Sequence, residues 1–348
     1  ALPIWAAFVT SGDVTNPLVS TAWATLPDLQ AKIDAAADNA TITLDSNTEI
    51  AATLQITKNL TLDLNGCTLR MTGTGSVLKV SGRATLTITD SSAAKSGTIT
   101  GGNAEYGGGV YVDDYAALKM TGGCITGCHA SRGGGGIYSS GNLYMGGTAK
   151  IEKCTGSDDA IWNRENSDIY ADGGTVDGTV NNQGTIKRSE GAAAVTVFNG
   201  TVYNRSAGTI IAGIYNGTVE NNGTISGGTF CGGVTIRKGS WVWERTGSIS
   251  GGTFYSSIVN EAGPERVTGV TFAVTFDRGD GTKTEPTPVK YNDLVPKPTA
   301  PTKSGYTFTG WEDANGAYDF NTPVTGPLTL TARWEEVPSS GGYYYYPT

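Results

Sequence analysis

A short sequence motif, which we call the first phrase, occurs three times between residues 98 and 154. This repetition constrains the fold strongly. TITGG at Thr98–Gly102 returns as CITGC at Cys124–Cys128 and as KIEKC at Lys150–Cys154. The central isoleucines of the three copies are 26 residues apart at each step. Like residues at a period of this size are typical of stacked repeat architectures, in which each repeat contacts mainly its neighbours.

A second motif, which we call the second phrase, follows each copy of the first and recurs at similar intervals. GGGVYV at Gly107–Val112 returns as GGGIYS at Gly134–Ser139 and, in reduced form, as DAIWN at Asp159–Asn163. Alternating apolar and polar residues bounded by Gly, Asn, Asp or Ser are typical of short strands with one face inward. Such strands also occur in β-sandwiches, but like residues in register favour a coil of one-turn rungs. We therefore expect an all-β fold with a parallel β-helix solenoid over residues 41–270.

Composition excludes several classes of function. The chain has 348 residues and 50 glycines, but only 16% of its residues are charged, against roughly 25% in ordinary soluble domains. The net charge is −8 and no basic cluster stands out, so we expect no nucleic-acid partner. His129 is the single histidine, which argues against most histidine-based sites, and we expect neither a metal nor a cofactor. No apolar run approaches the roughly 20 residues of a membrane span, so no membrane insertion is expected.

The first 40 residues are expected to form a separate N-terminal segment with a capping helix. Leu26–Asp38 places Leu26, Leu29 and Ile33 on one helical face directly before the first strand signal. A parallel stack ends in unpaired backbone groups, so this helix is predicted to cap the N-terminal end of the coil. The residues Ala1–Phe8 are interpreted as the mature start of a secreted chain.

Two regions resemble known families. LTLDLNGCTL at Leu60–Leu69 and the GGG[V/I]Y phrase make residues 40–270 similar to the right-handed parallel β-helix of the pectin-lyase-like superfamily, and closer to its Gly-rich bacterial surface members than to its enzymes. Over residues 271–336, GYTFTGW at Gly305–Trp311 and TARW at Thr331–Trp334 resemble one Listeria–Bacteroides repeat, the B-repeat of internalin-type proteins. This resemblance implies a small β-grasp-like module of bacterial cell-surface proteins, and Trp311, Tyr318, Phe320 and Trp334 are expected in its core.

Residues 337–348 (VPSSGGYYYYPT) read as a Gly/Ser/Tyr tail. Because sheet ends invite strand addition, the apolar N-terminal residues and this tail are candidates for docking into neighbouring copies of the chain. The residues proposed for this assembly are Ile4, Trp5, Phe8, Tyr343, Tyr344, Tyr345 and Tyr346.

An acidic pair offers an enzymatic interpretation. The β-helix enzymes that cleave polygalacturonan use clustered aspartates with a nearby histidine and a basic residue, and Asp158 and Asp159 resemble part of that pattern. The other motifs of those enzymes are missing, and Ala160–Trp162 aligns with the GVY of the second phrase. We therefore expect Ile161 in the core and the two aspartates in a turn.

Two further sets of residues line up one repeat apart. Cys128 and Cys154 would lie on adjacent rungs about 4.8 Å apart, close enough for a disulfide or for a ladder of buried thiols. Tyr111, Tyr138 and Trp162 would form an aromatic row that points away from the neighbouring Val and Ile residues, so one of the two rows faces outward. This aromatic row is the candidate binding surface for sugar rings.

These observations favour a non-enzymatic, secreted bacterial cell-surface protein that acts as an adhesin or a structural scaffold. A variant of this hypothesis is end-to-end self-assembly into an extracellular filament or lattice, with the chain itself as partner. Other partners would be glycans or proteins of host or bacterial surfaces. The alternatives are a polysaccharide lyase or glycoside hydrolase of the β-helix superfamily, and a carbohydrate-binding module.

Overall fold

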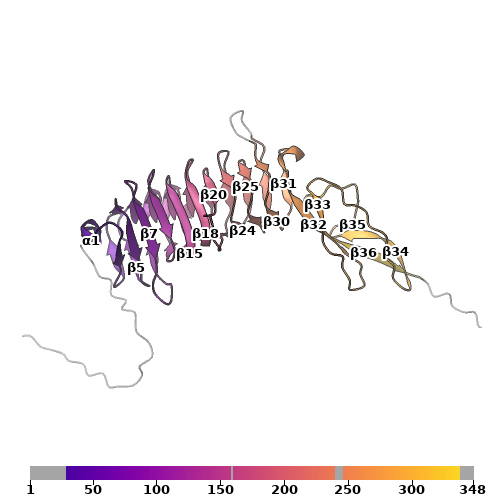
Figure 1. Ribbon diagram of the computed structural model, residues 1–348, viewed down its shortest axis with the longest axis horizontal. Helices are drawn as coiled ribbons and strands as arrows, with labels where there is room; N and C mark the ends of the chain where they lie inside the picture. The colour runs from indigo at the N-terminus through magenta and orange to yellow at the C-terminus, as the bar shows by residue number, and fades with distance from the viewer. Residues whose placement is uncertain (1–28, 158–159, 240–245, 338–348) are drawn as a thin grey trace, which may run out of the picture.

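The computed structural model describes residues 29–157, 160–239 and 246–337. In this part of the chain, short parallel strands stack into a long solenoid that is followed by a small five-stranded sheet (Figure 1). The expected all-β architecture with a parallel β-helix is confirmed.

One face of the solenoid is a ten-stranded parallel sheet in which every rung pairs with the next. Its strands are β3 (Leu54–Ile56), β6 (Leu78–Val80), β10 (Val110–Val112), β14 (Ile137–Ser139), β17 (Ile161–Asn163), β19 (Val180–Asn182), β22 (Val202–Asn204), β25 (Val219–Asn221), β28 (Val234–Ile236) and β31 (Ile258–Asn260).

The other two faces join in one 18-stranded sheet, because β15 (Asn142–Glu152) and β18 (Asp168–Asp177) run through both. The first face adds β1 (Ala40–Thr43), β4 (Leu60–Asp63), β7 (Thr85–Thr89), β11 (Ala117–Met120), β20 (Thr185–Lys187), β23 (Thr209–Ile210), β26 (Thr224–Ile225) and β29 (Ser248–Ile249). The second adds β2 (Thr48–Ile50), β5 (Thr68–Met71), β8 (Thr98–Thr100), β12 (Cys124–Thr126), β21 (Val197–Phe198), β24 (Ile214–Tyr215), β27 (Thr229–Phe230) and β30 (Thr253–Phe254).

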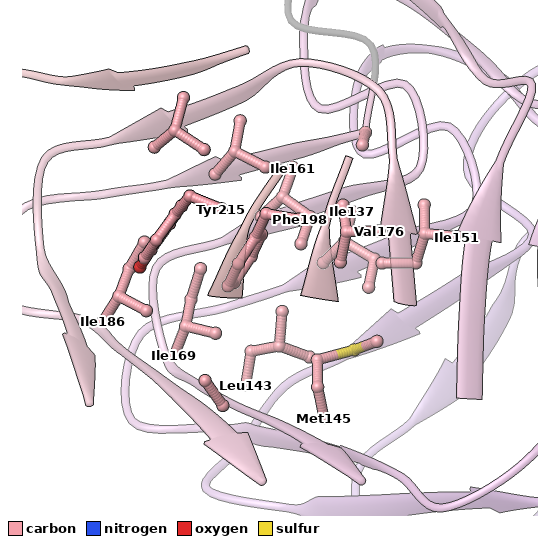
Figure 2. Close-up of a cluster of buried hydrophobic side chains, with 14 of the residues drawn as sticks. Ile137, Leu143, Met145, Ile151, Ile161, Ile169, Val176, Ile186, Phe198 and Tyr215 are labelled. Atoms are coloured by element: carbon pink, nitrogen blue, oxygen red, sulfur yellow. The ribbon is translucent and has the colours of Figure 1, made fainter. Parts of the chain in front are cut away.

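Inside the coil, like side chains from successive rungs stack on one another, and Figure 2 shows this core around Ile151, Val176 and Phe198. Ile125 pairs with Ile99 on one side and with Ile151 on the other, as the 26-residue spacing predicts. All three isoleucines are fully buried. The period of the repeat is therefore the length of one turn of the coil.

The same inward row turns aromatic farther along. Phe198, Tyr215, Phe230 and Phe254 stack face to face, with centroid distances of 5.0, 4.9 and 4.7 Å and interplanar angles below 10°. The buried Tyr215 hydroxyl donates a hydrogen bond to the Ala212 carbonyl at 2.7 Å. The row thus fills these C-terminal rungs, and its buried hydroxyl has a hydrogen-bond partner.

A ladder of buried asparagines lies at the ends of four successive strands of the ten-stranded sheet, β17, β19, β22 and β25. Asn163, Asn182, Asn204 and Asn221 are fully buried. Each of the first three donates from Nδ2 to the Oδ1 of the next asparagine, at 2.8, 2.8 and 2.7 Å, and Asn221 donates to the Ser248 carbonyl at 3.0 Å. Side-chain amides thereby repeat the hydrogen bonding of the backbone ladder along the axis of the coil.

The glycines of the second phrase allow the rungs to approach each other closely. A Cβ on Gly109 would lie 2.5 Å from Cγ2 of Ile125 and 2.6 Å from the Gly136 carbonyl oxygen. No other residue fits there without moving the backbone, so the GGG triplet is a packing requirement of this coil.

The N-terminal helix is present, and it ends at Ala35, before the predicted end at Asp38. α1 spans Leu29–Ala35, with Leu29 and Ile33 buried, whereas Leu26, the third residue predicted for this helical face, lies outside the described residues. The Gln30 side-chain amide donates to the Gln55 carbonyl at 3.1 Å and accepts from the Gln55 N–H at 2.7 Å. Gln30 therefore occupies, at the edge of β3, the place of a preceding rung, which explains how the helix caps this edge.

The C-terminal module has parallel central strands and antiparallel outer ones. β32 (Thr271–Asp277) pairs in parallel with β36 (Leu328–Glu336), while β33 (Thr287–Lys290) and β34 (Tyr306–Asp313) are antiparallel to their neighbours. β35 (Gly316–Ala317) completes the sheet, and a 3-10 turn, η1 (Pro264–Arg266), precedes it.

The core of this module differs in part from the sequence expectation. Trp311 is buried, and its ring packs edge-on against Phe276 at 4.9 Å. Trp334, Tyr318 and Phe320 are only partly buried, because the module is one thin sheet and their outer edges reach solvent.

The module, together with the segment that leads into it, closes much of the C-terminal end of the solenoid. The Ile258 N–H in β31 donates to the Thr325 carbonyl at 2.8 Å, and Val267 forms a parallel bridge with Ile249 in β29. Thus two of the three faces have a partner where the next rung would be. Within the described residues, β30 has a strand partner only on its β27 side.

Candidate functional site

The aromatic row lies on the outer face of the ten-stranded sheet, as its register predicts. Tyr138 pairs with Tyr111 in β10 and with Trp162 in β17, while Val110, Ile137 and Ile161 point inward and are fully buried. The rings of Tyr111 and Tyr138 stack with centroids 4.9 Å apart, and Trp162 meets Tyr138 edge-on at 5.9 Å.

A short extra sheet covers most of this row. It consists of β9 (Asn103–Tyr106), β13 (His129–Gly133) and β16 (Thr155–Gly156). The Tyr106 ring lies 4.9 Å from that of Tyr138, which is only 6% exposed.

Gly133 contributes to the same cover. A Cβ on this glycine would lie 1.7 Å from Cε3 of Trp162, so its backbone rests directly on the indole. The outward row is therefore a packed aromatic cluster and not an open platform. Sequence reasoning missed both Tyr106 and Gly133. The available signal was that NAEYG and HASRG follow the first phrase at equivalent positions.

Charged groups flank the cluster. The Lys79 ammonium lies 5.2 Å from the centroid of the half-buried Tyr111 ring, and Arg132 pairs with Glu105 at 2.9 Å. Burial and the neighbouring Tyr138 raise the pKa of Tyr111, so this phenol stays neutral near pH 7. Trp162 Nε1 is buried and has no hydrogen-bond partner in the described part of the chain.

The two aligned cysteines are neighbours in the core. His129 pairs with Thr155, which puts Cys128 beside Cys154, and both are buried free thiols in the structure. The hydrogen bond with Cys154, together with burial, raises the pKa of Cys128. Cys231, in contrast, is exposed, because it lies in the turn directly after β27.

Several predicted site residues cannot be placed. Asp158 and Asp159 lie outside the described residues, as do the assembly candidates Ile4, Trp5, Phe8 and Tyr343–Tyr346. Next to the acidic pair, Ala160 and Ile161 are buried, and Ile161 takes its predicted place in the core.

In the described residues no group of three or more His, Cys, Asp or Glu side chains converges in a way that could hold a metal ion. None of the described helices is both long and apolar enough to cross a membrane.

Comparison with known protein families gives a match for the C-terminal module. Residues 272–333 match the family model of the Listeria-Bacteroides repeat domain. The matched residues run from the second residue of β32 into β36, so they cover the five-stranded module and stop short of the solenoid.

A 68-residue stretch is 34% identical to a protein of Evansella cellulosilytica described as a putative Gly-rich membrane protein. The match covers 18% of this chain and 8% of that relative, so the chain spans only a small fraction of the relative's length. No solved structure matches the chain.

Proposed function

We propose that this chain is a non-enzymatic protein of the bacterial cell surface, in which the solenoid is a stiff scaffold that presents the repeat module. The observation that carries the proposal is the continuous core between the two parts. The stacked rings of the solenoid end at Phe254, and Phe272 of the module packs against this ring with centroids 6.4 Å apart. A backbone hydrogen bond from Ile258 to the Thr325 carbonyl adds a second connection.

Such a junction suits display at a distance. A flexible linker would let the module turn freely, whereas a shared core and a backbone hydrogen bond fix its direction relative to the rod. The Listeria-Bacteroides repeat match and the resemblance to a Gly-rich putative membrane protein support a place at the cell envelope. Adhesion to a surface protein or glycan, or a scaffolding role, would follow from that placement.

Self-assembly is a finer form of the same proposal. Because Thr325 and Val267 occupy the next-rung positions on two faces, complete rungs of two copies could not stack at this end. The edge of β30 would instead accept a single extended segment, for which the apolar N-terminal residues or the tyrosine tail of a second copy are the candidates. Electron microscopy of the purified chain would distinguish filaments from single rods.

Labelling of intact cells tests the surface role. Antibodies against residues 272–333 should label intact cells of the producing bacterium, and brief external protease treatment should remove the label. Labelling that requires permeabilised cells would overturn the proposal.

The proposal that the chain is not an enzyme has a separate test. The purified chain should release neither reducing ends nor unsaturated products from pectins and other polysaccharides. Activity that is lost in an Asp158→Asn/Asp159→Asn variant would instead identify a polysaccharide-cleaving enzyme.

A further inference from the structure

Two cavities lie in line along one edge of the solenoid, where the ten-stranded sheet turns into the next face. The first, of about 310 Å³, is lined mainly by Asp114, Tyr115, Asn142 and Glu165. The second, of about 450 Å³, begins at the same Glu165 and Asn166 and continues to Ser206. The shared residues make the two cavities one interrupted groove parallel to the axis of the coil.

The groove arises because long and short turns alternate along this edge. Asp113–Ala116, Arg164–Ser167 and Arg205–Gly208 are four-residue turns, each closed by a backbone hydrogen bond from its last to its first residue. The rungs between them turn more tightly, through Gly141 and Gly184. A Cβ on Gly141 would lie 2.0 Å from the Ala116 carbonyl oxygen, and one on Gly184 would lie 1.9 Å from that of Ser167. The long turns are therefore walls, and glycine backbone forms the floor.

Tyr115 forms an exposed aromatic wall of the first cavity. Its side chain is 81% exposed, and its φ of 63° is a left-handed conformation that a bulky residue rarely adopts. The equivalent position of the next long turn is Asn166, with φ of 65°, and asparagine tolerates this conformation well. The fold therefore does not require a tyrosine here.

The rest of the groove offers polar atoms. The Asp114 and Glu165 carboxylates form no ion pair and accept no side-chain hydrogen bond from the part of the chain that the structure describes. The Arg83 guanidinium lies 5.5 Å from the Tyr115 ring and holds it from one side. Arg205, at the far end, is turned toward Tyr203 and Asn181 on the sheet face.

We propose that this groove, which we call the turn-edge groove, binds an extended uncharged glycan. An exposed ring can stack on the apolar face of a sugar, and free carboxylates and amides can accept or donate hydrogen bonds to its hydroxyl groups. The same carboxylates repel polyuronates, so the groove selects against the acidic pectins. Four rung spacings separate the outer walls, about 19 Å, which suits a chain of several sugar units.

This assignment goes beyond the proposed surface role, because a rod can present its module without binding a glycan. The groove also differs from the aromatic cluster around Tyr138, whose central ring is buried under the β9–β13–β16 sheet. Its test can therefore fail while cell-surface labelling succeeds, and the reverse also holds.

The experiment is affinity electrophoresis and titration of the full chain with soluble β-glucan, mannan and polygalacturonate. The wild type should bind at least one of the neutral polymers and not polygalacturonate. Tyr115→Asn should weaken that binding by about tenfold or more. Its melting temperature should be unchanged or higher, since asparagine suits the left-handed backbone.

Tyr255→Asn is the matched control, because Tyr255 is also an exposed tyrosine, 67% accessible, but lies near the module. It should bind as the wild type does. An Asp114→Asn/Glu165→Gln variant should weaken neutral binding as well. Failure to bind either neutral polymer, wild-type binding by Tyr115→Asn, or a preference for polygalacturonate would overturn the proposal.

Discussion

The ring of Phe254 in the last aromatic rung meets the ring of Phe272 in the first strand of the repeat module at an interplanar angle of 66°. The face-to-face stack of the solenoid therefore ends against an edge-on ring, and this ring belongs to the next structural unit. Phe272 is buried, so solenoid and module share a core at this point.

Loss of the Phe272 ring should destabilise the module and loosen its attachment. Phe272→Ala is expected to reduce the free energy of unfolding by roughly 3–5 kcal/mol, because it removes a buried ring and leaves a cavity. Chemical denaturation monitored by tryptophan fluorescence measures this, since Trp311 and Trp334 lie in the module. Tyr255→Ala is the control and should change stability by about 0.5 kcal/mol or less. Equal effects of the two substitutions would contradict a shared core.

The asparagine ladder should be sensitive to a break in its middle. Asn204 accepts from Asn182 and donates to Asn221, so Asn204→Ala leaves two buried amide groups without these partners. We expect a loss of about 2–4 kcal/mol, since each buried unsatisfied group costs roughly 1–3 kcal/mol. Asn216→Ala is the control, because Asn216 donates a similar 2.8 Å bond to Asn199 on the exposed surface. Thermal unfolding of the two variants compares a buried ladder with an exposed one.

The register of the solenoid could be predicted from the sequence, because identical or similar residues return where rungs pair. Ile125 on Ile151 and Tyr138 on Trp162 are examples. The short sheet that covers Tyr138 could not be predicted from the sequence. Its strands β9 and β13 lack a clear apolar alternation, and which face of the ten-stranded sheet they cover depends on the direction of the backbone.

The turn-edge groove was also not predictable. It depends on the difference in length between successive turns, such as Asp113–Ala116 and the tighter one at Gly141, and on which carbonyl oxygens their glycines approach. Sequence spacing shows that turns exist but not which of them project.

Low pH should reduce the stability of the solenoid, because the Asp90 carboxylate becomes protonated. This side chain is buried, which by itself would raise its pKa, but N–H groups of Gly66, Ser92 and Gly97 donate to it at 2.8, 3.1 and 2.7 Å. The net result is a lowered pKa. A lowered folded-state pKa stabilises the fold above the unfolded value of about 3.9, and this stabilisation is lost as pH falls through the folded value.

We therefore expect the free energy of unfolding to fall between about pH 5 and pH 2, and the fall to be smaller in Asp90→Asn. Denaturant titrations at pH 7, 4 and 2.5 measure it. Asp114→Asn, which removes an exposed carboxylate from a turn, is the control for the loss of one negative charge. An identical profile for Asp90→Asn and the wild type would show that other groups control acid sensitivity.

The thiols should differ sharply in reactivity. Burial raises the pKa of Cys124 to about 11, and the hydrogen bond with Cys154 together with burial raises that of Cys128, so neither forms the reactive thiolate near pH 8. Cys231 is exposed, and a disulfide reagent should label it rapidly in the native protein. Cys231→Ser should remove this fast phase. In denaturant all five thiols should react; a count of three would instead show that Cys128 and Cys154 are joined in a disulfide across adjacent rungs.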